Sequence, residues 1–140
     1  MAEAKTKKTR ASVSEFLAKA ATGERLADAR KLVRIMSAIT GDRPAMWGPS
    51  IVGFGAYTLT YASGRTAEWP VAAFAPRKPA TVVYITRGAK NYEALIKKIG
   101  KVKIAGGCMH IKSLADVNVD ALTQLIAECA EYTREKHRKR

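Results

Sequence analysis

The chain has 140 residues, an apolar fraction of 47% and a formal net charge of +13 at pH 7. This length fits one domain with its own hydrophobic core, so folding needs neither a disulfide framework nor a metal. Two cysteines are too few for such a framework, and no apolar run approaches the roughly 20 residues of a membrane-spanning helix. These features exclude a disulfide-rich secreted protein and a membrane partner, and we expect a cytosolic protein.

The positive charge is unevenly distributed along the chain. Residues 77–112 contain nine Lys and Arg residues and a single acid, Glu93, whereas residues 113–132 contain four acids and no Lys or Arg. We expect residues 1–11 to be a disordered basic tail, residues 12–133 a single domain and residues 134–140 a basic C-terminal tail. Such a pattern attracts polyanions at long range.

Two helices are predicted in the first third of the chain. Ser12 and Glu15 have the spacing of a capping box, which predicts a short helix that ends before Gly23. Apolar residues at helical spacing predict a second helix over about residues 24–39, with Gly41 as its stop. Residues 42–44 are expected to form the exit loop.

The period then changes to that of strands. Alternating or β-branched residues predict strands over 50–54, 56–62, 68–75 and 81–86, with turns at 63–65 and 76–79. Both faces of 81–86 are apolar, so we expect this strand in the middle of the sheet. Successive strands joined by tight turns favour antiparallel pairing.

The last third alternates helix and strand. We predict a helix over 91–99, a basic loop over 101–107, a strand over 108–112, a turn over 113–117 and a last helix capped by Asn118. The whole order predicts an α+β fold with two layers, in which an antiparallel sheet of about five strands carries helices packed on one face.

Several ordered blocks of sequence carry a resemblance to a known family. They read MWGPSIVGFGAY, YASGR, FAPRK, TVVYI, YEALIKKIGK and GGCMHIKSLADVNVDAL. Over about residues 30–130 the chain resembles the YdhG-like domains, a family of unknown function. The resemblance implies a compact α+β domain with helices packed on an antiparallel sheet. Some relatives are described as frataxin-like iron chaperones, but the family has no established catalytic residues, so the resemblance implies none here.

Glycines and aromatic rings gather between residues 46 and 78. Gly53 and Gly55 permit a close backbone approach or a positive φ, but the third glycine and the following helix of a dinucleotide fingerprint are missing. The pattern is typical of a strand bulge packed by an aromatic ring. We predict that a groove for a small anionic ligand or a protein partner is formed by Trp47, Tyr57, Tyr61, Trp69 and Arg77.

The basic segment suggests a second kind of contact. We predict that anions bind near Lys78, Lys98, Lys101 and Lys103, beside the flexible Gly106-Gly107 pair. The alternative hypothesis is a basic nucleic-acid-associated protein that uses residues 77–112, although no P-loop, helix-turn-helix or RNA-binding aromatic motif occurs.

The sequence contains no recognisable catalytic set. Cys108 and His110 share one face of a predicted strand but lie about 7 Å apart along it, which strains a nucleophile–base pair. A further alternative is an iron chaperone that uses Asp116, Asp120, Glu128 and Glu131, but the net positive charge opposes cation capture. We therefore predict a binding module that is not an enzyme and has no cofactor or metal.

Overall fold

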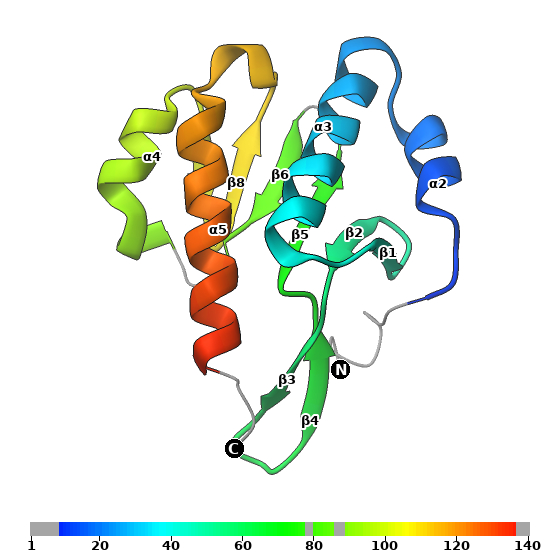
Figure 1. Cartoon of the computed structure of the whole chain (residues 1–140), viewed down its shortest axis with the longest axis vertical. Coiled ribbons are helices and arrows are strands. Elements are labelled where there is room, and N and C mark those ends of the chain that lie inside the picture. Colours follow the sequence, from blue (N-terminus) through cyan, green and yellow to red (C-terminus); the bar gives the residue numbers. More distant parts are fainter. Residues whose placement is uncertain (1–8, 78–79, 86–88, 137–140) are drawn as a thin grey trace.

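The computed structural model describes residues 9–77, 80–85 and 89–136 of the chain. These residues form an α+β fold with two layers, in which the helices lie on one side of a sheet (Figure 1). The predicted fold class is confirmed. The main sheet has six antiparallel strands in the order β1-β2-β5-β6-β8-β7, and a second sheet consists of the hairpin β3–β4.

The helices and strands have the following bounds. The strands are β1 (Pro44–Trp47), β2 (Ile51–Phe54), β3 (Tyr57–Thr60), β4 (Thr66–Trp69), β5 (Ala72–Pro76), β6 (Thr81–Tyr84), β7 (Lys103–Ala105) and β8 (Cys108–Ile111). The helices are α2 (Val13–Ala20), α3 (Gly23–Thr40), α4 (Glu93–Ile99) and α5 (Val119–Lys136), with short 3₁₀ turns at Ala89–Tyr92 and Leu114–Asp116. None of these helices is long and apolar enough to cross a bilayer.

The local signals for helix ends act as predicted. The Oγ atom of Ser12 accepts a hydrogen bond from the amide of Glu15, which opens α2. Gly41 ends α3 in the left-handed conformation with φ 75°. The side-chain oxygen of Asn118 accepts a hydrogen bond from the amide of Ala121 at the start of α5.

The core lies between the helices and one face of the main sheet. Strand alternation directs one set of buried apolar side chains toward this layer: Met46, Val52, Phe54, Phe74, Val83, Met109 and Ile111. They share a core with α3 and α5, whose fully buried residues include Leu32, Met36, Leu122 and Leu125. The other set of side chains on the same strands therefore faces away from the helices.

The two edge strands were not predicted. The β1 strand begins at Pro44, inside the predicted exit loop, and β7 occupies the middle of the predicted basic loop 101–107. Both strands are short, and they carry a proline or a lysine, which are features that protect sheet edges and weaken the strand signal. In the main sheet β1 and β7 join four of the five predicted strands, whereas the predicted strand 56–62 belongs to the hairpin, so the main sheet has six strands instead of about five.

The structure divides one predicted strand, and ordered backbone continues into both predicted tails. The predicted strand 68–75 is interrupted at Pro70, so its first part belongs to β4 and its second part to β5. Helix α5 continues to Lys136, beyond the predicted start of the C-terminal tail at residue 134. At the other end, the amide of Thr9 donates a hydrogen bond to the carbonyl of Met46, so this residue of the predicted tail lies beside β1.

The hairpin β3–β4 is a bent extension of β2 and β5. It projects from the end of the main sheet (Figure 1). The bend falls at Gly55, which has φ 70°, and at Pro70 and Val71 on the neighbouring strand. A Cβ atom on residue 55 would lie 2.7 Å from a carboxylate oxygen of Asp42, so glycine is required there both for the backbone angle and for the space.

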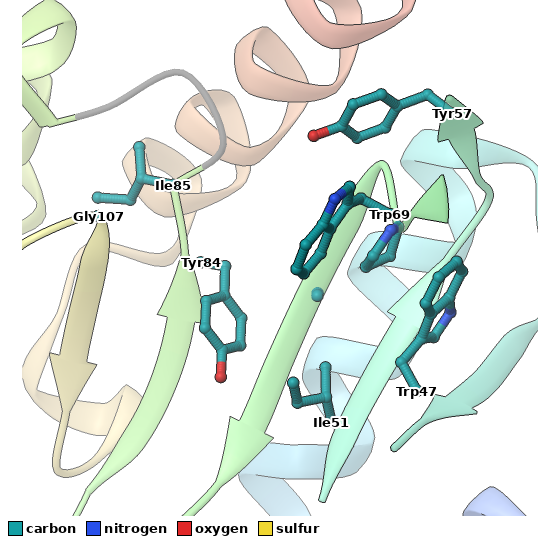
Figure 2. Close-up of a pocket in the computed structure, with 9 residues that line it drawn as sticks. Trp47, Ile51, Tyr57, Trp69, Tyr84, Ile85 and Gly107 are labelled. Carbon is teal, nitrogen blue, oxygen red and sulfur yellow. The ribbon is translucent and has the colours of Figure 1, made fainter. Parts of the chain in front are cut away.

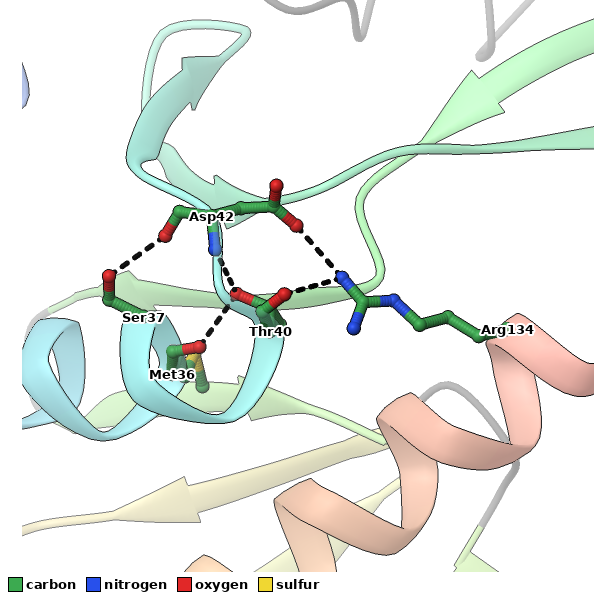
Figure 3. Close-up of polar contacts among 5 residues, drawn as sticks. All are labelled: Met36, Ser37, Thr40, Asp42 and Arg134. Carbon is green, nitrogen blue, oxygen red and sulfur yellow. Dashed lines mark hydrogen bonds and ion pairs between the residues drawn. The ribbon is translucent and has the colours of Figure 1, made fainter.

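A polar cluster joins the C-terminus of α3 to α5 (Figure 3). The guanidinium of Arg134 donates hydrogen bonds to the Thr40 carbonyl at 2.7 Å and to the Asp42 carboxylate at 2.8 Å. The hydroxyl of Thr40 donates to the Met36 carbonyl, and the hydroxyl of Ser37 donates to the Asp42 carbonyl. Arg134 thus satisfies a carbonyl that the helix end would otherwise leave without a partner.

Candidate functional site

The candidate site lies on the face of the main sheet that points away from the helices. Figure 2 shows its side chains in front of the strands and the helices behind them. The strand register places Trp47, Gly53, Ala73, Tyr84 and His110 on this face, because their neighbours in each strand enter the core. We call it the open face.

A cavity of about 190 Å³ occupies the part of the open face next to β1, β2 and β5. Its lining consists of Trp47, Ile51, Tyr57, Trp69, Pro70, Ala73, Tyr84, Ile85 and Gly107. Tyr84 stands on one side, and Trp69 and Ile51 stand on the other (Figure 2). Ala73 is small and buried in the sheet, so it leaves room above the strands and forms the floor. The lining is almost wholly aromatic and aliphatic.

Trp47 is fixed at one side of this cavity by a glycine. The side chain is 1% exposed, and its indole lies against Gly53 and Pro70. A Cβ atom on residue 53 would meet the indole Nε1 at 2.7 Å, a separation that packed atoms do not reach. The pairing of β1 with β2 and of β2 with β5 continues through Gly53, so the glycine serves close packing of the ring and not a bulge.

The bent hairpin supplies two further rings. Tyr57 and Trp69 are direct partners across β3 and β4, so both side chains lie on the same face of the ribbon. The bend at Gly55 and Pro70 brings that face to the cavity, where both residues are part of the lining. Residues from the six strands β1 to β6 and from the loops beside them thus converge on one small volume.

The polar groups at this site are few. Burial, and to a smaller degree the neighbouring Tyr61 phenol, raises the pKa of Tyr57 above its ordinary value of 10.0, so the hydroxyl stays protonated at neutral pH. The indole N–H groups of Trp47 and Trp69 are buried, and neither has a hydrogen-bond acceptor among the described residues. Both nitrogen atoms are covered by protein, so the surface that the cavity offers is mainly apolar and suits a ring.

The structure brings three of the five predicted groove residues together. Trp47, Tyr57 and Trp69 line the cavity, whereas Tyr61 lies just past the end of β3 and is not part of the lining. Arg77 follows β5, is exposed, and donates a hydrogen bond to the hydroxyl of Ser50 at 3.4 Å. It too lies outside the lining.

Arg77 nevertheless acts on the open face through its charge. Burial raises the pKa of the Cys108 thiol above its ordinary value of 9.0, and the positive charge of Arg77 lowers it by a smaller amount. Cys108 is the cross-strand partner of Tyr84, at the border of the cavity. It is partly exposed, which differs from the buried position that a small core residue would have.

The four predicted anion-binding lysines do not form one cluster. Lys103 lies on the open face in β7, next to His110. Lys98 belongs to α4 and borders a hollow with Gln124 and Glu128 of α5, in the helix layer. Lys101 is exposed between α4 and β7, and Lys78 lies outside the described residues.

The described residues offer no assembled metal site. They contain no group of three or more His, Cys, Asp or Glu side chains that could hold a metal ion. In the acidic set predicted for iron, Glu128 accepts a hydrogen bond from the amide of Gln124. Iron binding therefore receives no support from the arrangement of these side chains.

Several lining residues were not predicted. Tyr84 was predicted only as a residue of a strand in the middle of the sheet, and Ile51, Pro70 and Ala73 were treated as ordinary strand residues. The signal for Tyr84 is its register, because the alternation that sends Val83 into the core sends Tyr84 to the opposite face. Only the position of β6 between β5 and β8 shows that this ring faces the two tryptophans.

Comparison of the chain with family models, with curated proteins and with solved structures gives no match. The resemblance to the YdhG-like domains stays a prediction from the sequence blocks alone. The function is therefore inferred from the geometry and chemistry of the open face.

Proposed function

We propose that the chain is a non-enzymatic binding module that holds the ring of a small anionic compound in the cavity of the open face. The observation that carries this proposal is the convergence of Trp47, Tyr57, Trp69 and Tyr84 on one volume of about 190 Å³. Rings of this kind bind a planar apolar group by stacking and edge contacts.

The surrounding charge favours an anion. The chain has a formal net charge of +13, and the positive charge of Arg77 acts at Cys108 on the border of the cavity. The titratable groups among the described lining residues are the phenols of Tyr57 and Tyr84. A lining of this composition supplies affinity for a ring and no nucleophile–base pair, which supports a binding role over catalysis.

Tryptophan fluorescence tests this proposal directly, because both tryptophans of the chain line the cavity. Phenyl phosphate and 1-naphthyl phosphate are titrated into the protein. Two further probes each lack one part of these compounds: 1-naphthol has no phosphate, and inorganic phosphate has no ring. We expect a saturable change in emission with the aryl phosphates and weaker binding of the other two compounds. A linear response to all four would remove the cavity from consideration as a binding site.

Two variants localise the binding. Ala73→Leu places a larger side chain on the cavity floor and is expected to weaken aryl phosphate binding at least tenfold, since the added atoms occupy the volume of the ring. Tyr61→Ser is the matched control, because Tyr61 lies on the same ribbon outside the lining. Equal loss of affinity in both variants would point to binding elsewhere.

A further inference from the structure

The open face carries positive charge without negative charge. The six strands of the main sheet contain no Asp or Glu. Most acidic side chains of the described residues belong instead to the helices and their adjoining turns, for example Glu24, Asp28, Glu93, Asp120 and Glu128. The strands of the main sheet therefore lack the carboxylates that accompany the basic side chains of the helices, which suits an anion on this face.

Two lysines of this face lie beside His110 at β7 and β8. Lys103 is the direct cross-strand partner of His110, and Lys112 follows His110 by two residues on the same side. These three side chains, with Ala80 and Ala105, border a hollow of about 380 Å³. Among the described residues, none of the three has a hydrogen-bond or ion-pair partner. We call Lys103, His110 and Lys112 the basic cluster.

The basic cluster and the aromatic cavity are neighbours on one face. Tyr84 lines the cavity and pairs with Cys108, which is two residues before His110 in β8. With strands about 4.8 Å apart and a rise of about 3.4 Å per residue, Ala73 and His110 are separated by on the order of 12 Å. This distance is longer than the reach from a base to its own phosphate, so one nucleotide does not span it, whereas two or more linked nucleotides do.

We propose that the open face binds single-stranded nucleic acid, with one base in the aromatic cavity and backbone phosphates of adjoining nucleotides at the basic cluster. The inference rests on the proposed function, because the base enters the same cavity as the ring of a small anion. Aromatic platforms beside cationic grooves are the usual means of binding single strands. A duplex does not fit this arrangement, since its bases are stacked and paired and cannot enter the cavity.

The experiment measures fluorescence anisotropy of labelled ten-nucleotide strands, dT and rU, as a function of salt, together with the emission of the two tryptophans. We expect binding that quenches tryptophan emission and weakens steeply with salt. The two strands compare DNA with RNA. An oligomer of abasic deoxyribose phosphate carries the same charge without bases, so it is expected to bind more weakly and to leave the emission unchanged.

Two double variants with the same net charge distinguish binding at the basic cluster from nonspecific electrostatic attraction to the whole protein. Lys103→Gln with Lys112→Gln removes both lysines of the basic cluster, and Lys97→Gln with Lys98→Gln removes two exposed lysines of α4 in the helix layer. Loss of two phosphate contacts in the Lys103/Lys112 variant is expected to reduce the slope of log K against log salt concentration by about 1.4. The affinity at low salt is expected to fall roughly tenfold. The α4 variant is expected to retain nearly all of the affinity and slope.

The outcomes distinguish this inference from the proposed function. Equal losses in the two double variants, or strand binding without a change in tryptophan emission, would overturn the inference. Poly-glutamate that binds as tightly as dT and quenches equally would assign the face to an acidic polypeptide instead. If aryl phosphates bind in the cavity but neither strand does, the inference fails and the proposed function stands. If Ala73→Leu binds aryl phosphates as tightly as the unaltered protein does, the proposed function fails.

Discussion

The indole of Trp47 lies so close to Gly53 that a Cβ atom on residue 53 would be 2.5 Å from its Cδ1 atom. The two residues come from adjacent strands, β1 and β2, and the contact fixes the ring at the side of the cavity. A glycine in the interior of a strand weakens pairing. At this position glycine is required, because any side chain on residue 53 would overlap the buried indole of Trp47.

The first prediction concerns this contact. Gly53→Ala is expected to lower the free energy of unfolding by about 1–3 kcal/mol, because the added methyl group overlaps Trp47 and Pro70 and forces both to move. Urea unfolding measures the change. Gly107→Ala is the control, since the nearest described atom to a Cβ atom there would be the Ile85 carbonyl oxygen, at an ordinary contact distance of 3.8 Å. Replacing Trp47 by Leu in the Gly53→Ala protein is expected to restore part of the loss, and strict additivity would contradict the assigned contact.

The second prediction concerns the polar cluster between α3 and α5. Arg134→Met removes the hydrogen bond to the buried Thr40 carbonyl and the ion pair with Asp42 (Figure 3), and it is expected to cost about 1–2 kcal/mol of unfolding free energy. The ion pair contributes the smaller share, because both side chains are more than 40% exposed to solvent.

The control for this change is Arg30→Met on the exposed side of α3, where the same loss of charge is expected to have little effect. Thermal unfolding at low salt and at 1 M salt separates the two contributions of Arg134. Screening weakens the ion pair and leaves the hydrogen bond to the carbonyl largely intact. A cost for Arg134→Met that disappears at high salt would contradict the importance of the hydrogen bond.

The third prediction concerns Cys108 and its dependence on pH. Burial raises the pKa of the native thiol, so at a given pH below the native pKa the folded protein holds less thiolate than the unfolded chain does. Alkylation by iodoacetamide, followed by mass spectrometry in a Cys129→Ala background, is expected to be slower for the folded protein at pH 8. For the folded protein, the pH at which the alkylation rate is half of its maximum is expected above 9.0, the ordinary value of the thiol pKa.

Arg77→Gln tests which charge acts on this thiol. Arg77 lowers the pKa of Cys108, so its removal is expected to raise that pKa and to slow alkylation further at pH 8. Arg43→Gln is a control with the same change in net charge. A faster reaction in the Arg77 variant, or equal effects of the two substitutions, would place the guanidinium of Arg77 away from the open face.

The fold follows from sequence signals that act locally. Ser12 caps a helix, Gly41 ends one, and the two apolar faces of β6 place it in the middle of the sheet, all as the pattern predicts. The edge strands β1 and β7 carry weak patterns, because each is short and exposes one side of its backbone. The break at Pro70 was missed because apolar alternation continues through it, although proline has no amide for the ladder.

The candidate site follows only in part from such signals. The concentration of glycines and rings predicted Trp47, Tyr57 and Trp69, since aromatic residues beside strand glycines are typical of close packing. Tyr84 and the basic cluster required the strand order, because β6, β7 and β8 are distant in sequence from β1 and β2. Lys98 and Lys103 are near in sequence, but a helix end and a turn place them in different layers.

The titration of 1-naphthyl phosphate into the unaltered protein and into Ala73→Leu, followed by tryptophan emission, is the most direct test of the cavity as a binding site. We predict saturable quenching in the unaltered protein and at least tenfold weaker binding by the variant, whose circular dichroism spectrum shows that the fold is retained. Identical titration curves for the two proteins would contradict this prediction.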